Sequence, residues 1–162
     1  MNTFPFFRLR GALMAGVALL ALTAVSHAEQ ATVLVQLNEY DGDEAYFALY
    51  LVNPEGKYEK TLWLSGPEKV WWPQTARWWG YFSRNAEDVD AITGASTPSG
   101  ARAVMKIEID PKYIDAGYTL RVETSVDQQE NNQQDAEVAL TQGNQRVKTP
   151  GTGYVRYIRY KL

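Results

Sequence analysis

The segment most diagnostic of the fold reads Ala45-Tyr46-Phe47-Ala48-Leu49-Tyr50-Leu51-Val52, and Asn53-Pro54-Glu55-Gly56 and then residues 58–64 follow it. Aromatic and branched side chains are frequent in both outer runs, and such side chains favour β-strands. The asparagine, proline and glycine between the runs are typical of a tight turn, because they suit its special backbone angles. We therefore expect residues 45–52 and 58–64 to form a β-hairpin.

Outward from this hairpin, five further runs have the composition of short strands. They are residues 31–37, 103–109, 117–126, 136–140 and 153–160. A helix is favoured only over residues 74–83, for one or two turns. Short strands separated by turns predict an all-β fold, an immunoglobulin-like antiparallel β-sandwich of about seven strands.

The first residues of the chain have the organisation of an export signal. Arg8 and Arg10 form a positively charged start, residues 11–25 form an apolar run, and Ser26-His27-Ala28 places small residues where signal peptidase cleaves. We therefore expect a Sec signal peptide that is cleaved before Glu29.

This leader divides the chain into a signal peptide over residues 1–28 and a single β-sandwich domain over residues 29–162. A retained membrane anchor is the competing interpretation, but the apolar run is short and alanine-rich for a span that needs about 20 residues. We expect the mature protein to be exported, soluble and periplasmic.

The mature composition excludes several classes of chemistry. The chain has no cysteine, and its one histidine, His27, belongs to the leader. The mature protein therefore lacks the residues for a Ser-His-Asp or Cys-His nucleophile and for a His/Cys site for zinc, copper or haem. The leader holds two of the 16 basic residues and none of the 19 acidic ones, which leaves 14 against 19 and a formal charge of −5. This acidic balance gives no reason to expect a nucleic-acid partner.

One motif stands out, and it reads Asp90-Ala91-Ile92-Thr93-Gly94-Ala95-Ser96. Its pattern resembles the site at which bacterial flavin transferases attach FMN to exported proteins through a phosphoester. The resemblance implies that Ser96 is the acceptor, where the pattern usually has threonine, and that Asp90, Thr93, Gly94 and Ala95 complete the modification site. Gly94 would give the loop backbone freedom, including a positive φ, and Ala95 adds little bulk beside the acceptor. The alternative is an ordinary surface turn, because the composition is also typical of loops.

Four of the five tryptophans lie within residues 71–79. Such a cluster can seal one end of a sandwich core. The functional alternative is a stacking wall for the isoalloxazine ring of a flavin, formed by Trp78 and Trp79, with Arg77 facing the phosphate or a reduced, anionic flavin.

Two polar segments have simpler interpretations. Residues 127–135 are almost wholly Gln, Asn and acidic residues, and we expect a solvated hairpin loop there. Residues 38–44 contain carboxylates at close spacing but lack the terminal bidentate glutamate of a calcium loop. We expect an acidic turn between two strands and no metal site.

Several segments in one order resemble the DUF2271 family of predicted periplasmic proteins. They are Tyr46-Phe47-Ala48-Leu49-Tyr50, Asn53-Pro54-Glu55-Gly56-Lys57, Thr61-Leu62-Trp63, Arg77-Trp78-Trp79 and residues 90–96. Members of that family tend to occur with flavin transferases, PepSY-type membrane reductases and siderophore receptors, which implies periplasmic redox work linked to iron uptake. The C-terminal half departs from the family, because Val126-Asp127-Gln128 stands where an Arg-Glu-His run is expected.

We therefore expect a periplasmic redox protein that carries covalent FMN on Ser96 and passes electrons between a membrane reductase and an acceptor. Catalysis would belong to the flavin, so an electron-transfer flavoprotein is favoured over a stand-alone enzyme. The alternative is a cofactor-free immunoglobulin-like binding module that docks a membrane or periplasmic partner. Carbohydrate binding by the tryptophan cluster is a weaker third interpretation.

Overall fold

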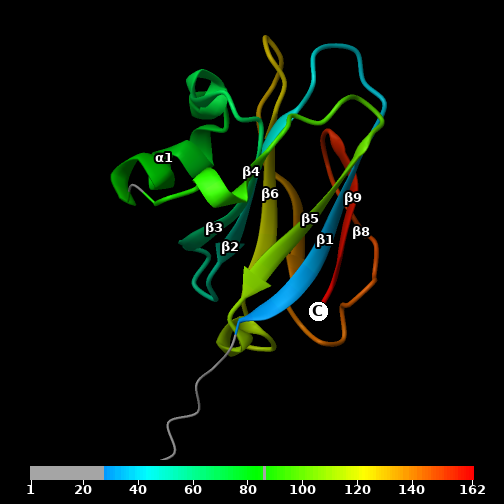
Figure 1. Ribbon diagram of the computed structural model, residues 1–162. Helices are drawn as coiled ribbons and strands as arrows, with labels where there is room; N and C mark the ends of the chain where they lie inside the picture. Colours follow the sequence, from blue (N-terminus) through cyan, green and yellow to red (C-terminus); the bar gives the residue numbers. More distant parts are fainter. Residues whose placement is uncertain (1–27, 86) are drawn as a thin grey trace, which may run out of the picture.

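Two β-sheets pack face to face in the computed structural model, which describes residues 28–85 and 87–162 (Figure 1). Apart from Ala28, the predicted signal peptide lies outside the described residues. The first sheet has four strands in the order β5-β1-β9-β8. Its strands are β1 (Glu29–Leu37), β5 (Arg102–Ile109), β8 (Thr149–Pro150) and β9 (Val155–Lys161).

The second sheet has five strands in the order β4-β3-β2-β6-β7. They are β2 (Tyr46–Val52), β3 (Tyr58–Ser65), β4 (Thr93–Gly94), β6 (Thr119–Ser125) and β7 (Asn132–Ala139). The pairing of β3 with β4 is parallel, and the other pairings between named strands are antiparallel. The described residues thus form seven strands of seven to nine residues and two of two residues. This arrangement confirms the predicted immunoglobulin-like antiparallel sandwich.

The expected hairpin is formed by β2 and β3, and its turn is held by a side chain. The Oδ1 atom of Asn53 accepts hydrogen bonds from the backbone N–H groups of Glu55 and Lys57, at 3.1 and 2.9 Å. Gly56 has a φ of 76°, in the left-handed region that favours glycine. The residues that predicted the turn are therefore the ones that stabilise it.

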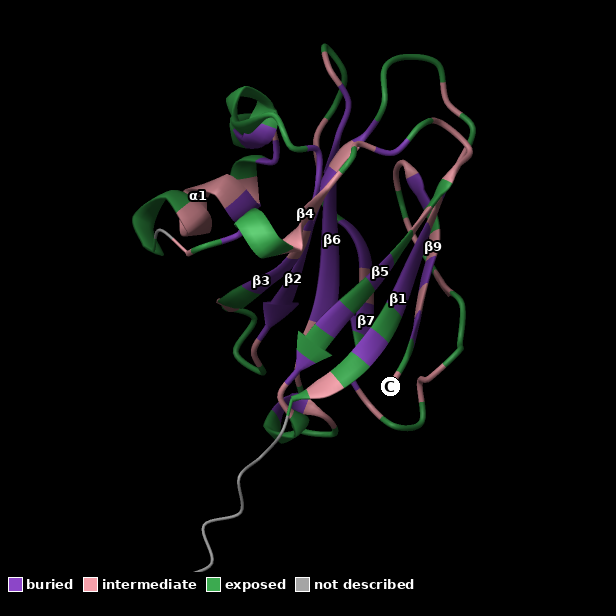
Figure 2. Cartoon of the chain, viewed as in Figure 1, coloured by how far each residue is buried: buried purple, intermediate pink, exposed green. Residues whose placement is uncertain are grey.

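The inner faces of the two sheets enclose a core that is largely aliphatic. Val33 and Val35 on β1 and Phe47 and Leu49 on β2 belong to this inter-sheet core and are almost completely buried. Figure 2 shows the alternation along β5, where exposed and buried residues follow one another, whereas β1 has three consecutive buried residues, Val33, Leu34 and Val35. Each such large apolar side chain contributes roughly 1.5–3 kcal/mol by leaving water.

A second core, which we call the outer core, lies on the opposite face of the five-stranded sheet. The 3-10 helix η1 (Lys69–Gln74) and the helix α1 (Ala76–Asn85) cover this face of β2 and β3 (Figure 1). Ala48 and Tyr50 of β2 point into the outer core, so this strand is buried on both faces. The helix predicted over residues 74–83 is confirmed. The tryptophan segment, however, covers a sheet face and does not seal one end of the sandwich, because β2 has no polar face to present to water.

Part of the polar segment 127–135 belongs to a strand, and the predicted solvated loop is wrong for that part. β7 begins at Asn132, and Asp135 within it is fully buried. The Asp135 carboxylate accepts hydrogen bonds from the Thr124 hydroxyl at 2.6 Å and from the N–H groups of Gly153 and Val155 at 2.7 and 3.0 Å. These bonds offset the cost of burying a charge and tie β7 to the start of β9 in the other sheet.

Candidate functional site

The motif segment runs along the edge of the five-stranded sheet, beside β3. The 3-10 helix η2 (Asp90–Ile92) leads into β4 (Thr93–Gly94), which pairs in parallel with the end of β3. A little further on, Thr97 forms an isolated bridge with Ala45, just before β2. The backbone is therefore held on both sides of Ser96. The remaining 3-10 helix, η3 (Pro111–Tyr113), follows β5 and takes no part in this segment.

The two neighbouring hydroxyl residues, Ser96 and Thr97, have different surroundings. Ser96 is partly exposed, and its Oγ donates a hydrogen bond to the Oε2 of Glu44 in the acidic turn before β2. Thr97 is 4% exposed, and its Oγ1 lies 2.9 Å from the Oγ of Ser65. Of these two, Ser96 has the hydroxyl that a second protein can reach. The sequence did not point to Glu44, because 52 positions separate it from Ser96.

Glycine at position 94 is required by a close contact and not by a special backbone angle. The φ of Gly94 is not positive, so that part of the prediction is wrong. A Cβ atom there would lie 2.6 Å from the Cζ2 of Trp63, which is far closer than carbon atoms pack. The carbonyl of Gly94 accepts a hydrogen bond from the N–H of Gly66 at 2.8 Å, and the carbonyl of Ala95 accepts one from the Ser65 hydroxyl at 2.7 Å. The small motif residues thus let the chain lie against β3.

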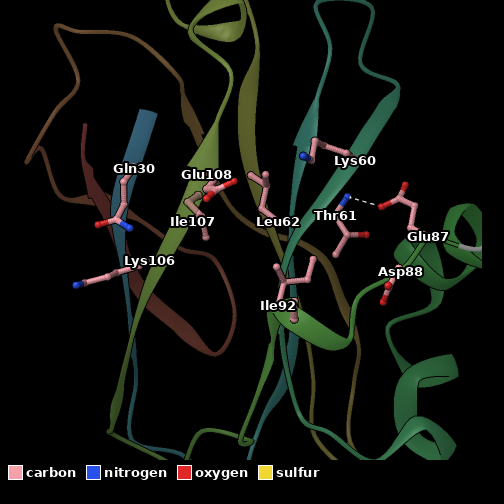
Figure 3. Close-up of a pocket in the computed structure, with 11 residues that line it drawn as sticks. Gln30, Lys60, Thr61, Leu62, Glu87, Asp88, Ile92, Lys106, Ile107 and Glu108 are labelled. Carbon is pink, nitrogen blue, oxygen red and sulfur yellow. Dashed lines mark hydrogen bonds between the residues drawn. The ribbon is translucent and has the colours of Figure 1, made fainter. Parts of the chain in front are cut away.

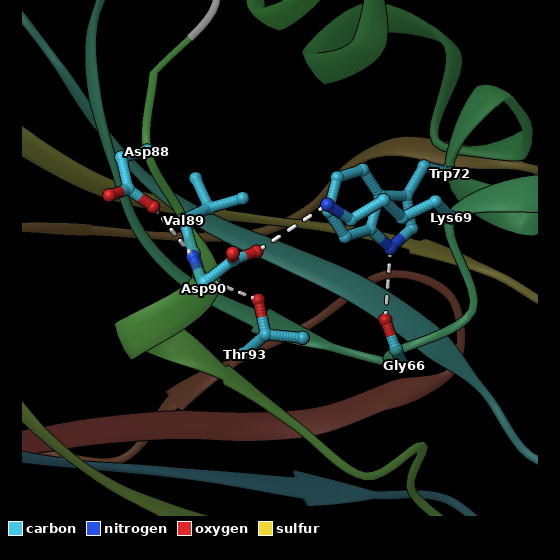
Figure 4. A network of polar contacts seen from close by, with 7 residues as sticks. All are labelled: Gly66, Lys69, Trp72, Asp88, Val89, Asp90 and Thr93. Carbon is cyan, nitrogen blue, oxygen red and sulfur yellow. Dashed lines mark hydrogen bonds and ion pairs between the residues drawn. The ribbon is translucent and has the colours of Figure 1, made fainter.

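Side chains at the start of the motif connect it to η1 (Figure 4). The Asp90 side chain is 81% exposed and forms an ion pair with Lys69 at 3.4 Å. The Nζ of Lys69 lies 5.5 Å from the centroid of the Trp72 ring, and the Nε1 of Trp72 donates to the Gly66 carbonyl at 3.0 Å. The Thr93 hydroxyl donates a hydrogen bond to the backbone carbonyl four residues earlier, at 2.7 Å. The Thr93 hydroxyl is therefore engaged, while the Asp90 carboxylate stays accessible to solvent.

The residues predicted to form a stacking wall for flavin differ in exposure. Trp78 is fully buried, its ring stacks on Phe82 with centroids 4.8 Å apart, and its Nε1 donates to the Thr61 hydroxyl at 2.9 Å. Trp78 therefore presents no ring face to a ligand. Trp79 and Arg77 are half-buried, so a contact between these two side chains and a flavin stays a prediction.

A buried carboxylate outside the predicted site holds α1 in place. The two carboxylate oxygens of Glu123, on β6, accept hydrogen bonds from the N–H groups of Arg77 and Trp78 at 2.9 and 2.8 Å. These groups belong to the first turn of α1, where free donors and the helix dipole favour a negative charge. Burial raises the pKa of Glu123, although the two hydrogen bonds oppose the shift. In the sequence, the one indication of this buried carboxylate is that Glu123 stands between Val122 and Thr124 in a run predicted to be a strand.

A groove of ≈750 Å³ opens between β3 and β5, beside the motif segment (Figure 3). Leu62, Ile92 and Ile107 line it with apolar surface, and Lys60, Lys106, Glu87, Asp88 and Glu108 add charges of both signs. Glu87 fixes one wall, because its carboxylate accepts hydrogen bonds from the Thr61 N–H at 3.0 Å and the Tyr58 hydroxyl at 2.6 Å. Burial and this hydrogen bond raise the pKa of Tyr58.

Within residues 28–85 and 87–162, no group of three or more His, Cys, Asp or Glu side chains is arranged to hold a metal ion. In the same part of the chain, no helix has the length and apolar character needed to cross a membrane. The acidic turn over residues 38–44 has one observed contact with the motif, through Glu44.

Comparison with protein families matches residues 28–157 to the family described as Predicted periplasmic protein (DUF2271). Because the match spans most of the sequence, the chain belongs to this family. The family description confirms the predicted periplasmic location and specifies no activity. Searches of the curated proteins and of the solved structures found no match.

Proposed function

We propose that this member of the DUF2271 family carries FMN, joined through a phosphoester to Ser96, and passes electrons in a flavin-based system of the periplasm. The proposal rests on one observation: the last position of the motif has an accessible hydroxyl, while the adjacent Thr97 is buried. A flavin transferase would load the protein and a PepSY-type membrane reductase would supply electrons. Reduction of iron or siderophore compounds would be the downstream use.

Attachment needs a free hydroxyl, a place for its proton and an activated phosphorus atom. The Oγ of Ser96 would form a bond to the phosphorus of an FMN donor that is activated as a phosphoanhydride. The bond from that phosphorus to the leaving phosphate would break at the same time. Glu44 already accepts the hydrogen bond of the Ser96 hydroxyl, so its carboxylate is placed to take the proton.

Residues on two sides of the motif are candidates to hold the flavin. The groove has apolar side chains at Leu62 and Ile92 and an ammonium group at Lys60, and Ile92 directly precedes β4. Trp79 and Arg77 are the half-buried candidates on α1. Bound FMN supplies one- and two-electron transfer. The protein's share is to orient the ring and to limit its contact with water.

Co-expression with a flavin transferase tests the attachment. The wild-type protein should gain roughly 440 Da, the mass of one esterified FMN, on the peptide that contains Ser96. Ser96→Ala should gain nothing, because no hydroxyl remains at the acceptor position. Thr93→Ala is the matched control and should still be labelled. Glu44→Gln should be labelled at least about tenfold more slowly, because the proton acceptor is lost.

The outcomes separate the parts of the proposal. An unlabelled wild type, with a known substrate labelled in the same cells, would reject FMN attachment and favour the cofactor-free binding module. A label mapped to Thr97 would contradict the assignment of Ser96. Equal labelling rates for the wild type and Glu44→Gln would remove the role of Glu44 alone.

A further inference from the structure

The outer surface of the four-stranded sheet is basic, although the protein as a whole is acidic. Seven of the 14 basic residues in positions 29–162 lie on this surface or at its rim, where the strands also carry one outward-facing acid, Glu108. We call this surface the basic face; its cations are Arg102, Lys106, Arg146, Lys148, Arg156, Arg159 and Lys161. Seven basic and 18 acidic residues remain for the rest of the mature chain. The basic face therefore concentrates positive potential and attracts anions.

A hollow of ≈350 Å³ lies on the basic face. Leu34 of β1 and Val104 of β5 are paired in register and form its apolar part. Val104 is 58% exposed, which leaves an apolar side chain open to solvent in the middle of a strand. Arg146, Arg159 and Lys161 supply the charged lining of the same hollow. An apolar patch next to three cations has the chemistry to recognise an amphiphilic anion.

The three cations of the hollow have no counterion in the part of the chain that the structure describes. None of Arg146, Arg159 and Lys161 forms an ion pair there. Their mutual repulsion would be relieved by a bound anion. Arg146 also has a φ of 64°, which is uncommon for a residue other than glycine. Its N–H donates to the Tyr160 carbonyl at 2.7 Å, and this bond holds Arg146 against β9.

We propose that this hollow binds a small organic anion, a carboxylate or phosphate joined to an apolar group. The anionic end would contact Arg146, Arg159 and Lys161, because guanidinium and ammonium groups bind such oxygens through charge-assisted hydrogen bonds. The apolar part would cover Leu34 and Val104. The hollow belongs to the four-stranded sheet and the motif to the other sheet, so this proposal is independent of FMN attachment.

Three probes of related structure test the proposal by amide chemical shifts in NMR spectra of the mature protein. Octanoate has both an anionic and an apolar end, acetate has only the anion, and octylammonium has the same chain with a positive charge. Octanoate should shift the amides of Val104, Arg146 and Arg159 to saturation, and its affinity should fall as salt is added. Acetate should bind about tenfold more weakly, and octylammonium should not produce these shifts.

Two variants and a charge-matched control complete the test. Arg159→Gln combined with Lys161→Gln should weaken octanoate binding about tenfold or more. Val104→Asp, which places a carboxylate where the side chain is 58% exposed, should abolish octanoate binding. Lys57→Gln combined with Arg84→Gln removes the same charge at exposed positions elsewhere and should leave the affinity unchanged. The proposal is overturned if octanoate does not saturate, if octylammonium shifts the same amides, or if the Arg159/Lys161 variant binds like the wild type.

Discussion

The two cores on either side of β2 are built from different chemistry. Between the sheets, the buried side chains are largely aliphatic, and side chains such as those of Val33 and Leu49 have no polar group that could form a hydrogen bond. In the outer core the largest side chains are aromatic, and each buried indole N–H has an acceptor. Trp72 donates to the Gly66 carbonyl at 3.0 Å, and Trp78 donates to the Thr61 hydroxyl at 2.9 Å.

This difference separates the part of the molecule that forms the scaffold from the part that positions the candidate site. Aliphatic packing depends on area and volume, and such cores tolerate volume-conserving changes. Directional hydrogen bonds fix one orientation of a helix against a sheet. Because Val89 belongs to the outer core and Ile92 packs against it, the outer core helps to position the start of the motif.

The largest expected effect is on the outer core itself. Trp78→Ala should lower the free energy of unfolding by about 3–5 kcal/mol, because the whole ring and its hydrogen bond to Thr61 are lost. Trp79→Ala should cost only about 1–2 kcal/mol, because that side chain is half-buried. Denaturant midpoints of the protein without FMN measure both values. Equal losses would contradict the distinction between a ring inside the outer core and one at its rim.

Glu123→Gln should cost about 1–3 kcal/mol at neutral pH, because the amide nitrogen that replaces one carboxyl oxygen cannot accept a hydrogen bond from the N–H group of α1 that faces it. The pH dependence is the sharper test. Burial raises the pKa of Glu123 in the folded protein, so the folded chain binds this proton more tightly than the unfolded chain does. The contribution of the wild-type carboxyl to stability therefore grows as the pH falls through the folded pKa. This contribution levels off once the pH is below 4.5, the ordinary pKa of a glutamate side chain.

Free energies of unfolding for the wild type and Glu123→Gln, measured from mildly alkaline to acidic pH, check this sign. The advantage of the wild type should widen toward acidic pH. If the advantage shrinks, the N-terminus of α1 stabilises the charged carboxylate by more than burial penalises it, and the expected direction is wrong.

The smallest expected effects are the changes in stability when two glycines are each replaced by alanine. Gly94→Ala should lower stability by about 1–2 kcal/mol, because the new Cβ would lie 2.6 Å from the Trp63 ring. Gly80→Ala, inside α1 with nothing within 4 Å of the added Cβ, should raise stability by about 0.5–1 kcal/mol. Thermal unfolding measures both shifts. A shift of the same sign for the two variants would refute the contact argument for Gly94.

The strands and the turn of the hairpin could be predicted because their signals are local. Alternating apolar residues indicate the strands β1 and β5. In the hairpin, Asn53 and Gly56 indicate the turn between β2 and β3. The unbroken apolar run of β2 also held the signal for a second core, since a strand with one solvent face alternates. That signal shows that something covers the outer face, but it does not identify the tryptophan segment as the cover.

The features that were missed depend on residues far apart in the sequence. Asp135 appears within a polar segment, yet its backbone partners Gly153 and Val155 lie 18 and 20 positions away. Glu44 is 52 positions from Ser96, and no local pattern connects them. The motif indicates that residue 94 must be small. It does not indicate that the ring of Trp63 is what requires a small residue there. FMN attachment to Ser96 stays a prediction.

The backbone on either side of Ser96 has a consequence for anything attached there. The Gly94 carbonyl accepts a hydrogen bond from Gly66, and Thr97 forms a bridge with Ala45. The backbone at Ser96 is therefore fixed on both sides. The positions open to a group esterified to the Ser96 hydroxyl would therefore depend on the length of that group, because the backbone that carries it does not move. A docked partner would meet that group at a local concentration on the order of millimolar, however little of the protein the compartment holds. The rate of exchange would then depend on how long the partner stays docked.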